Sequence, residues 1–251
     1  MISLSVNVNK IATLRNSRGG SVPSVIAAVE TCLGAGAPGI TVHPRADERH
    51  IRASDAVEIG EWLAERARQD GTVAEYNIEG DPRPDLLELV HWIRPTQCTL
   101  VPVTPGEITS HAGWSPDVRS EWLRAIVADL KRAGIRVSLF IDPGVAPVRW
   151  AADLGADRIE LYTEPFATAF SRGPESAAAS FAQYCEAANV AHALGLGING
   201  GHDLDLENLV MFRDLPHLDE VSIGHALISR AVWVGLDRVV REYLEVLKGA
   251  A

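Results

Sequence analysis

Histidine and glutamate side chains that can transfer protons recur in this chain at or near the ends of short runs of β-branched residues. His43 follows the run GITV, His202 follows GINGG and His225 follows EVSIG. Glu79 and Glu160 lie within similar runs. Imidazole and carboxyl groups are common general acids and bases in enzymes. We therefore expect a site of proton transfer wherever the fold brings the ends of these runs together.

Basic side chains gather in the two segments that follow the first and second of these runs. They are Lys10, Arg15, Arg18, Arg45, Arg49 and His50. Glycines recur after the last two runs, at Gly200-Gly201 and Gly224. Glycine lets the backbone approach an anion closely, and the last two strand–helix loops of a (β/α)8 barrel commonly bind phosphate. The pattern predicts a phosphorylated substrate, although tight turns alone would also use these glycines.

The histidines and cysteines lack the spacing of a metal site. The chain has no HxH pair and no HExxH helix, and Cys32, Cys98 and Cys185 lie far apart. A zinc or iron site needs several ligands that converge on one point. We therefore expect no metal and no disulfide framework, and three separate thiols fit a reducing cytoplasm.

Short β-branched runs alternate with longer helical patterns along the whole chain. The expected strands are 3–8, 39–43, 73–79, 98–103, 137–142, 158–163, 195–200 and 220–224. The expected helices lie near 24–34, 54–69, 83–93, 115–133, 146–154, 175–193, 205–213 and 226–247. Eight such units in 251 residues are typical of a (β/α)8 TIM barrel, whose chemistry gathers at the carboxyl ends of the strands. An open doubly wound sheet is the rival fold, but no GxGxxG follows the first strand.

We therefore expect one TIM-barrel domain over residues 1–251. Within it, Ser115 as N-cap and Pro116 at the first helical position predict the start of the helix 115–133, and Gly134 predicts its end. Three long loops are expected on the face that carries the strand ends. They are 9–23, 104–114 and 164–174, and the glycines and small polar residues of the second suit a lid.

The composition is that of a globular protein and argues against several other classes of protein. Apolar residues make up 47% of the chain and charged residues 22%, so a core of ordinary size can be buried. The net charge of −10 and the absence of a basic run argue against a nucleic-acid-binding protein. No basic and apolar leader opens the chain, and no apolar run is long enough to span a bilayer.

Eight segments together resemble one family, that of pyridoxine 5′-phosphate synthase, and they cover nearly the whole chain in order. The segments are VNVNKIATLRNSRGG (6–20), GITVHPRADERHI (39–51), NIEG (77–80), LVPVTPGEITSHAGW (100–114), AGIRVSLFID (133–142), RIELYTEPFA (158–167), GLGINGGHDLDLENL (195–209) and EVSIGHALISRAV (220–232). The resemblance implies a (β/α)8 barrel without metal or organic cofactor and an octamer built from dimers. The implied reaction joins 3-amino-2-oxopropyl phosphate to 1-deoxy-D-xylulose 5-phosphate and gives pyridoxine 5′-phosphate, inorganic phosphate and water.

The same resemblance implies roles for individual residues. It makes His43 and Glu79 an acid/base pair, His202 a proton donor and Glu160 a carboxylate that supports the transition states. The amino-ketone phosphate would be held by Asn7, Arg18, Gly224, His225 and the backbone of Asp203. The pentulose phosphate would be held by Asn9, Lys10, Arg45, His50 and Thr109.

Three departures from the pattern of many family members involve four positions. Asn9-Lys10 stands in place of Asp-His, which removes a possible proton relay and adds positive charge. Asp203 stands in place of glycine, and an acid beside a phosphate is unfavourable unless its side chain points away. Tyr162 replaces a frequent histidine.

Two other functions fit the residues less well. A Schiff-base aldolase or a related phosphosugar enzyme would need a lysine on an inner strand, and Lys10, just after the first expected strand, is the only candidate. A sensor of phosphorylated ligands would have no use for the four acid/base residues. Borohydride trapping tests the first alternative, and a turnover assay tests the second.

Overall fold

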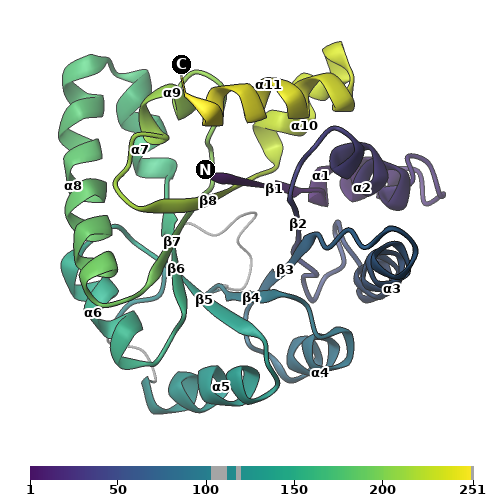
Figure 1. Ribbon diagram of the computed structural model, residues 1–251, viewed down its shortest axis with the longest axis horizontal. Coiled ribbons are helices and arrows are strands. Elements are labelled where there is room, and N and C mark those ends of the chain that lie inside the picture. Colours follow the sequence, from purple (N-terminus) through teal and green to yellow (C-terminus); the bar gives the residue numbers. More distant parts are fainter. Residues whose placement is uncertain (103–111, 117–119, 250–251) are drawn as a thin grey trace.

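Eight parallel strands close into one barrel in the computed structural model, which describes residues 1–102, 112–116 and 120–249 (Figure 1). The strands are β1 (Ser3–Asn7), β2 (Gly39–Val42), β3 (Glu75–Gly80), β4 (Gln97–Leu100), β5 (Arg136–Ile141), β6 (Arg158–Tyr162), β7 (Gly197–Gly201) and β8 (Leu218–Ile223). Each strand pairs with the next, and β1 pairs with β8 to close the ring. The predicted (β/α)8 TIM barrel is confirmed.

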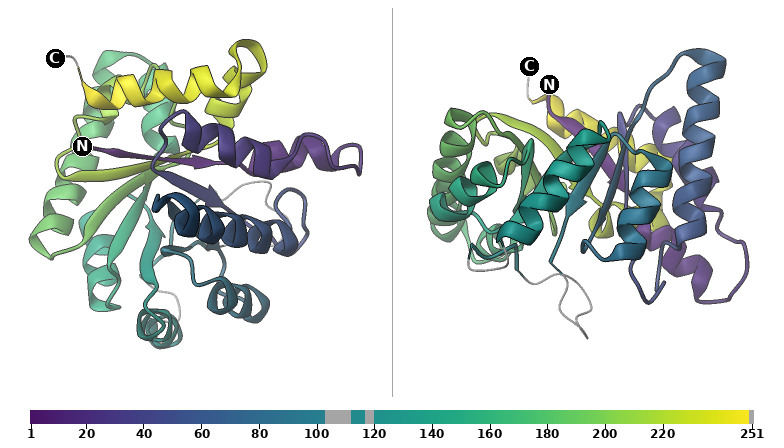
Figure 2. Two further views of the ribbon diagram at one scale, coloured as in Figure 1. Left: turned by 45° about the vertical axis from the view of Figure 1, so that its right-hand side comes forward. Right: turned by 90° about the horizontal axis from the view of Figure 1, so that it is seen from below.

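The helices surround the barrel as an outer layer (Figures 1 and 2). They are α1 (Asn9–Asn16), α2 (Val25–Gly34), α3 (Ala53–Asp70), α4 (Pro84–Ile93), α5 (Ser120–Arg132), α6 (Val145–Asp153), α7 (Glu164–Ser171), α8 (Pro174–Ala193), α9 (Leu209–Phe212), α10 (His225–Val234) and α11 (Leu236–Lys248). Each predicted helical region contains a helix. Among the described residues, no helix is long and apolar enough to cross a membrane.

Two of the predicted long loops contain short helices. The expected loop 9–23 begins with α1, and the expected loop 164–174 is largely α7. In α7, Pro165 occupies the first turn, where proline is favourable, and Phe166 is fully buried among aromatic rings. Packing of this short apolar face stabilises a helix that the loop interpretation did not anticipate. Most of the predicted lid 104–114 lies outside the described residues.

The predicted first helical position is wrong. Pro116 lies in a turn, and α5 begins at Ser120, with residues 117–119 outside the described part of the chain. The backbone N–H of Trp114 donates to the Phe140 carbonyl (2.8 Å), and its indole N–H donates to the Leu100 carbonyl (2.9 Å). These bonds hold Trp114 at the carboxyl ends of β4 and β5.

The predicted helix 226–247 is two helices. Gly235, with φ 89°, separates α10 from α11. A residue with positive φ cannot continue a right-handed helix, and glycine adopts this conformation at little cost. After the break, α11 packs against α2, α9 and α10.

The hydrophobic core lies between the strands and the helices. Alternate strand residues such as Leu4, Val6, Ile40 and Val42 are fully buried in it. Because side chains alternate along a strand, the residues between them point into the barrel.

The interior of the barrel is mostly polar among the described residues. Arg136 donates to Gln97 (2.8 Å), and Arg158 donates to Asn199 (2.8 Å). Further along the barrel, Thr99 donates to Asn77 (3.0 Å). A smaller apolar cluster of Val101, Phe140 and Tyr162 lies near the carboxyl ends of β4, β5 and β6. Glu79 and Glu160, near the carboxyl ends of the strands, therefore lie next to a hydrogen-bonded polar interior and not next to an aliphatic one.

Candidate active site

A cavity of about 520 Å³ opens at the carboxyl ends of the strands. Twelve residues proposed from the sequence line it: Asn7, Asn9, Lys10, His43, Arg45, His50, Glu79, Glu160, His202, Asp203, Gly224 and His225. Arg18 is exposed beyond the end of α1 and is not among the lining residues. Thr109 lies outside the described residues. Most of the residues that we predicted at or after the carboxyl ends of the strands therefore lie around one cavity.

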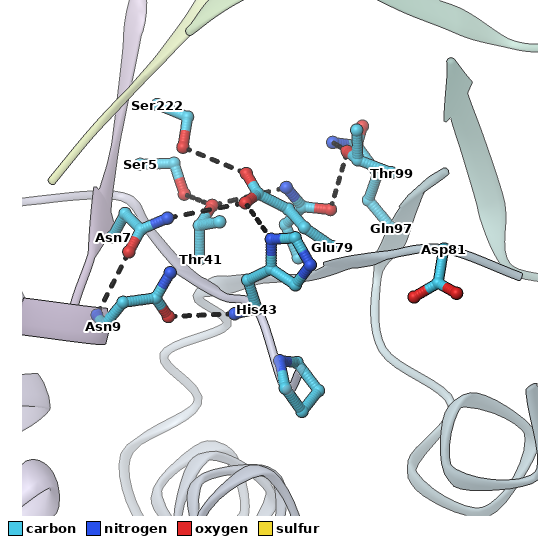
Figure 3. A network of polar contacts seen from close by, with 12 residues as sticks. Ser5, Asn7, Asn9, Thr41, His43, Glu79, Asp81, Gln97, Thr99 and Ser222 are labelled. Carbon is cyan, nitrogen blue, oxygen red and sulfur yellow. Dashed lines mark hydrogen bonds and ion pairs between the residues drawn. The ribbon is translucent and has the colours of Figure 1, made fainter. Parts of the chain in front are cut away.

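Glu79 occupies the centre of this site, at the end of β3 (Figure 3). Its Oε2 lies 3.9 Å from Nδ1 of His43 and accepts a long hydrogen bond from Nδ2 of Asn7 (3.5 Å). Its Oε1 accepts from Oγ of Ser222 (3.5 Å). Three strands and the segment after β2 therefore converge on one carboxyl group.

Burial moves His43 and Glu79 toward their neutral forms. Desolvation is the main reason why the pKa of His43 is lowered to about 3, and the positive charge of Arg45 contributes to this value. Desolvation raises the pKa of Glu79 to about 8. At neutral pH the carboxyl group therefore carries a proton and the imidazole has a free lone pair. The two groups form an acid beside a base.

Asn9 fixes the backbone of His43. Its side-chain Oδ1 accepts from the His43 N–H (2.9 Å), while its own N–H donates to Oδ1 of Asn7 (3.1 Å), as Figure 3 shows. The first of these bonds needs only an acceptor oxygen, which an asparagine supplies as well as an aspartate. The departure at position 9 thus retains a structural contact to the neighbouring loop.

Glu160 lies on β6 and contacts β7. It is 3% exposed, and desolvation with the nearby charge of Glu79 raises its pKa well above the usual value. A Cβ at Gly201 would collide with Oε1 of Glu160. Glycine at the end of β7 therefore makes the space that the carboxyl group occupies.

Three basic or imidazole side chains line the side of the cavity next to β1 and β2. Lys10 lies in the first turn of α1, and Arg45 and His50 follow β2. Desolvation, together with the positive charges of Arg45 and Lys10, lowers the pKa of His50 to about 4. A neutral imidazole between two cations suits a phosphate, because it donates a hydrogen bond without adding charge.

Arg15, which the sequence placed with these cations, is buried elsewhere. It is 7% exposed and forms an ion pair with Asp55 of α3, with NH2 to Oδ2 at 2.8 Å. Next to it, Nδ2 of Asn16 donates to the His50 carbonyl (2.7 Å). Arg15 and Asn16 therefore connect α1 to the segment that carries His50 and do not bind an anion in the cavity.

A second possible anion position lies at the start of α10. The helix begins at His225, directly after Gly224, and both line the cavity. A Cβ at Gly224 would lie 3.0 Å from Cβ of Asn7, so glycine permits a close approach of β8 to β1. The free N–H groups and positive dipole end of a helix attract phosphate.

His202 and Asp203 follow β7 and form a pair, with Nδ1 of His202 2.9 Å from Oδ2 of Asp203. The carboxylate of Asp203 is thus engaged by the neighbouring imidazole. Attraction to His202 lowers the pKa of Asp203. Because the carboxylate of Asp203 is bonded to His202, its unfavourable effect on a bound phosphate is reduced.

Several cavity residues were missed by sequence reasoning. Ser222, Thr13 and Phe140 line the cavity, and Ser222 also contacts Glu79. Ser222 lies on β8, two residues before Gly224, which follows the strand. Because alternate residues of a strand face the same side, this spacing predicts that Ser222 faces the cavity as Gly224 does. Among the described residues, no group of three or more histidine, cysteine, aspartate or glutamate side chains is placed to hold a metal ion.

Comparison with known proteins gives one consistent result. A family model described as "Pyridoxal phosphate biosynthesis protein PdxJ" matches residues 4–249. A pyridoxine 5′-phosphate synthase of Bacteroides fragilis (strain YCH46) is 49% identical over 249 residues, which are 99% of this chain and 100% of that protein. The pyridoxine 5′-phosphate synthase of Leptospira biflexa is 51% identical over 253 residues, covering 98% of this chain and 97% of that protein.

Solved structures of low sequence identity share the fold. The 3-keto-L-gulonate-6-phosphate decarboxylase of Vibrio cholerae superimposes with a TM-score of 0.60 at 9% identity, covering 98% of this chain and 97% of that chain. The phosphoribosyl anthranilate isomerase of Thermus thermophilus gives 0.58 at 15% identity, covering 98% of each chain. These likenesses concern the barrel alone.

Proposed function

The chain belongs to the PdxJ family of pyridoxine 5′-phosphate synthases, enzymes of vitamin B6 ring formation, and from this premise we propose the substrates and the residues that act on them. The substrates are 3-amino-2-oxopropyl phosphate and 1-deoxy-D-xylulose 5-phosphate, and the products are pyridoxine 5′-phosphate, inorganic phosphate and water. The observation that carries the proposal is the neutral acid/base pair of Glu79 and His43, 3.9 Å apart in the cavity. No cofactor takes part in the proposed steps.

The first step joins the amine of one substrate to the ketone of the other. Forming the imine requires that the nitrogen lose a proton and that the departing hydroxyl gain one. The protonated carboxyl group of Glu79 supplies the second proton, and the neutral imidazole of His43 accepts the first. Glu160 supports the transition states, and His202 donates a proton in a later step.

The bound phosphate adjusts the basicity of His43. The positive charge of Arg45 contributes to the low pKa of His43. A phosphate dianion beside Arg45 offsets this positive field, and the proton affinity of His43 then rises toward the range useful for catalysis. Binding of the substrate and activation of the base are thereby coupled.

The two phosphates occupy opposite sides of the cavity in this proposal. Asn9, Lys10, Arg45 and His50 hold the pentulose phosphate, together with Thr109. Asn7, Gly224, His225 and the backbone of Asp203 hold the amino-ketone phosphate, with Arg18 as a further contact. Support comes from the cationic side next to β1 and β2 and from the helix start at His225.

We also propose that the protein is a cytoplasmic octamer built from dimers. The three cysteines are free thiols, as a reducing compartment favours. Val232 and Trp233 on α10 are 70% and 85% exposed. Exposure of adjacent large apolar side chains to water is unfavourable, and contact with another subunit would bury them.

The decisive experiment mixes the protein with both phosphates and follows the absorbance of pyridoxine phosphate. Product should form only when both substrates are present, and release of inorganic phosphate should match it in amount. Failure to form product, or product from either phosphate alone, would refute the proposal. Trapping of a covalent adduct on Lys10 by borohydride would instead favour Schiff-base aldolase chemistry.

A further inference from the structure

A hydrogen bond between the side chains of His202 and Asp203 joins two neighbours in the sequence at the rim of the cavity. Nδ1 of His202 lies 2.9 Å from Oδ2 of Asp203, and the side chains are 25% and 42% exposed. Both residues have positive φ, 89° for His202 and 57° for Asp203. Left-handed backbone at two consecutive non-glycine residues is uncommon and costs free energy, so other contacts must hold it.

Contacts from neighbouring elements hold this dipeptide in place. The hydroxyl of Thr163, after β6, donates to the backbone carbonyls of Gly201 (2.8 Å) and His202. Nδ2 of Asn208 donates to the backbone carbonyl of Asp203 (3.0 Å). The ring of Tyr162 meets the imidazole edge-on, with centroids 5.2 Å apart and an interplanar angle of 77°. The orientation of the imidazole is therefore set from several sides.

The charges around the pair favour an ionised Asp203. His202 lowers the pKa of Asp203 by hydrogen bonding and by its charge, and His225 at the start of α10 adds to this effect. Glu160 on β6 lies against Gly201, but burial raises its pKa and favours its neutral form. An ionised carboxylate only accepts hydrogen bonds, so Nδ1 of His202 must be the donor in this pair.

We propose that Asp203 is a positioning residue that keeps the proton of the neutral His202 imidazole on Nδ1 and so reserves Nε2 for proton exchange with the substrate. The inference rests on the proposed role of His202 in the ring-forming reaction. A carboxylate bonded to one imidazole nitrogen fixes both the tautomer and the orientation of the ring. It also stabilises the imidazolium that carries the donated proton.

The test compares Asp203→Asn with the native enzyme. Asparagine tolerates left-handed backbone, so the loop keeps its shape, but its amide can donate as well as accept. Magic-angle-spinning ¹⁵N NMR of protein labelled at histidine reports the tautomer and is not limited by the size of the assembly. The His202 signals are assigned by their loss in His202→Gln. The native neutral ring should be in the Nδ1–H form, and the Nε2–H form should appear in Asp203→Asn.

Kinetics provide the second measurement. Turnover of Asp203→Asn should fall about 10- to 100-fold, part of the effect that one positioned proton-transfer group has, with KM for both phosphates changed less than about 3-fold. Asp203→Gly, which suits the positive φ, should give the same tautomer change and a similar loss. Asp214→Asn is the matched control, since this aspartate is 75% exposed and lies outside the cavity.

Two results would overturn the inference. One is a native His202 with its proton on Nε2, or a tautomer unchanged in both variants. The other is a rise of KM with kcat unchanged, which would mean that Asp203 supports binding alone. The NMR measurement does not depend on turnover, so a native protein that lacks synthase activity would refute the proposed function without deciding the tautomer.

Discussion

Replacing Glu79 by glutamine removes the acidic proton from the centre of the cavity and leaves the size of the side chain unchanged. The glutamine can still contact Ser222 and Asn7, which lie 3.5 Å from the native carboxyl oxygens. With a pKa of about 8, one unit above pH 7, the native carboxyl group is protonated in roughly ten molecules for each one that is ionised. It is therefore available as an acid at neutral pH, and glutamine is not.

We expect turnover of Glu79→Gln to fall by about 10² to 10⁴, the contribution of one well-placed acid. Dissociation constants of the two phosphates should change much less, because no phosphate contact is assigned to Glu79. In the native enzyme, turnover should decline as the pH rises through about 8, where the carboxyl group ionises. Initial rates of pyridoxine phosphate formation between pH 6 and 9.5, together with calorimetric binding of each phosphate, measure these effects.

The same substitution should change the pH dependence of stability. The folded pKa of about 8 lies above the usual value of 4.5, so the folded state binds the proton more tightly than the unfolded state. The stabilisation is complete below about pH 4.5 and is lost as the pH rises through about 8. The difference between these two pKa values corresponds to a loss on the order of 5 kcal/mol. Glu79→Gln should show a smaller decline in the free energy of unfolding between pH 5 and 8.

Urea unfolding at a fixed protein concentration measures this decline, and Glu88→Gln on the exposed side of α4 is the control. Some decline should remain in Glu79→Gln, because burial also raises the pKa of Glu160 and, to about 9, that of Glu220. Near-native turnover of Glu79→Gln would refute the assigned acid. A pH dependence of stability identical to that of the native protein would refute the raised pKa.

Three further predictions concern the cationic side, the buried ion pair and the assembly. Lys10→Met should weaken binding of the pentulose phosphate by about 10- to 150-fold, the equivalent of one charge-assisted hydrogen bond, and leave the amino-ketone phosphate nearly unaffected; an unchanged KM with full turnover would show that Lys10 points into solvent. Asp55→Asn should lower the free energy of unfolding by about 3 kcal/mol, because it leaves the guanidinium of Arg15 buried without its counter-charge; urea unfolding tests this, and a loss below about 1 kcal/mol would contradict it. Static light scattering should report an assembly larger than a dimer, and a monomer at micromolar concentration would end that expectation.

The sequence by itself determined the barrel, because its evidence is local and repeated. Each β-branched run, such as GITV before His43, predicts a strand from its own residues. Helix-ending glycines such as Gly134, with φ 80° in the structure, mark the passage into the next strand. Since parallel strands of a closed barrel end at one rim, the strand pattern alone predicts that residues as distant as His43 and His225 lie at the same rim.

Sequence patterns failed where a contact with a distant segment decided the outcome. Arg15 has the same charge as Lys10 and lies in the same segment, but only the packing of α1 against α3 shows that Asp55 buries it. The bond from the Trp114 indole to the Leu100 carbonyl likewise joins two segments whose contact local propensity does not predict. Secondary-structure propensity depends on residues that are near in the sequence. It contains no information about contacts with residues that are distant in the sequence, such as Asp55 for Arg15.

The chemical state of the site was decided by tertiary structure alone. Glu79 and Asp203 are both acids near strand ends, yet burial raises the pKa of Glu79 and the neighbouring imidazole lowers that of Asp203. The identity of a side chain determines which proton it can carry. Desolvation and the field of nearby charges, which exist only after folding, determine whether it carries that proton at neutral pH.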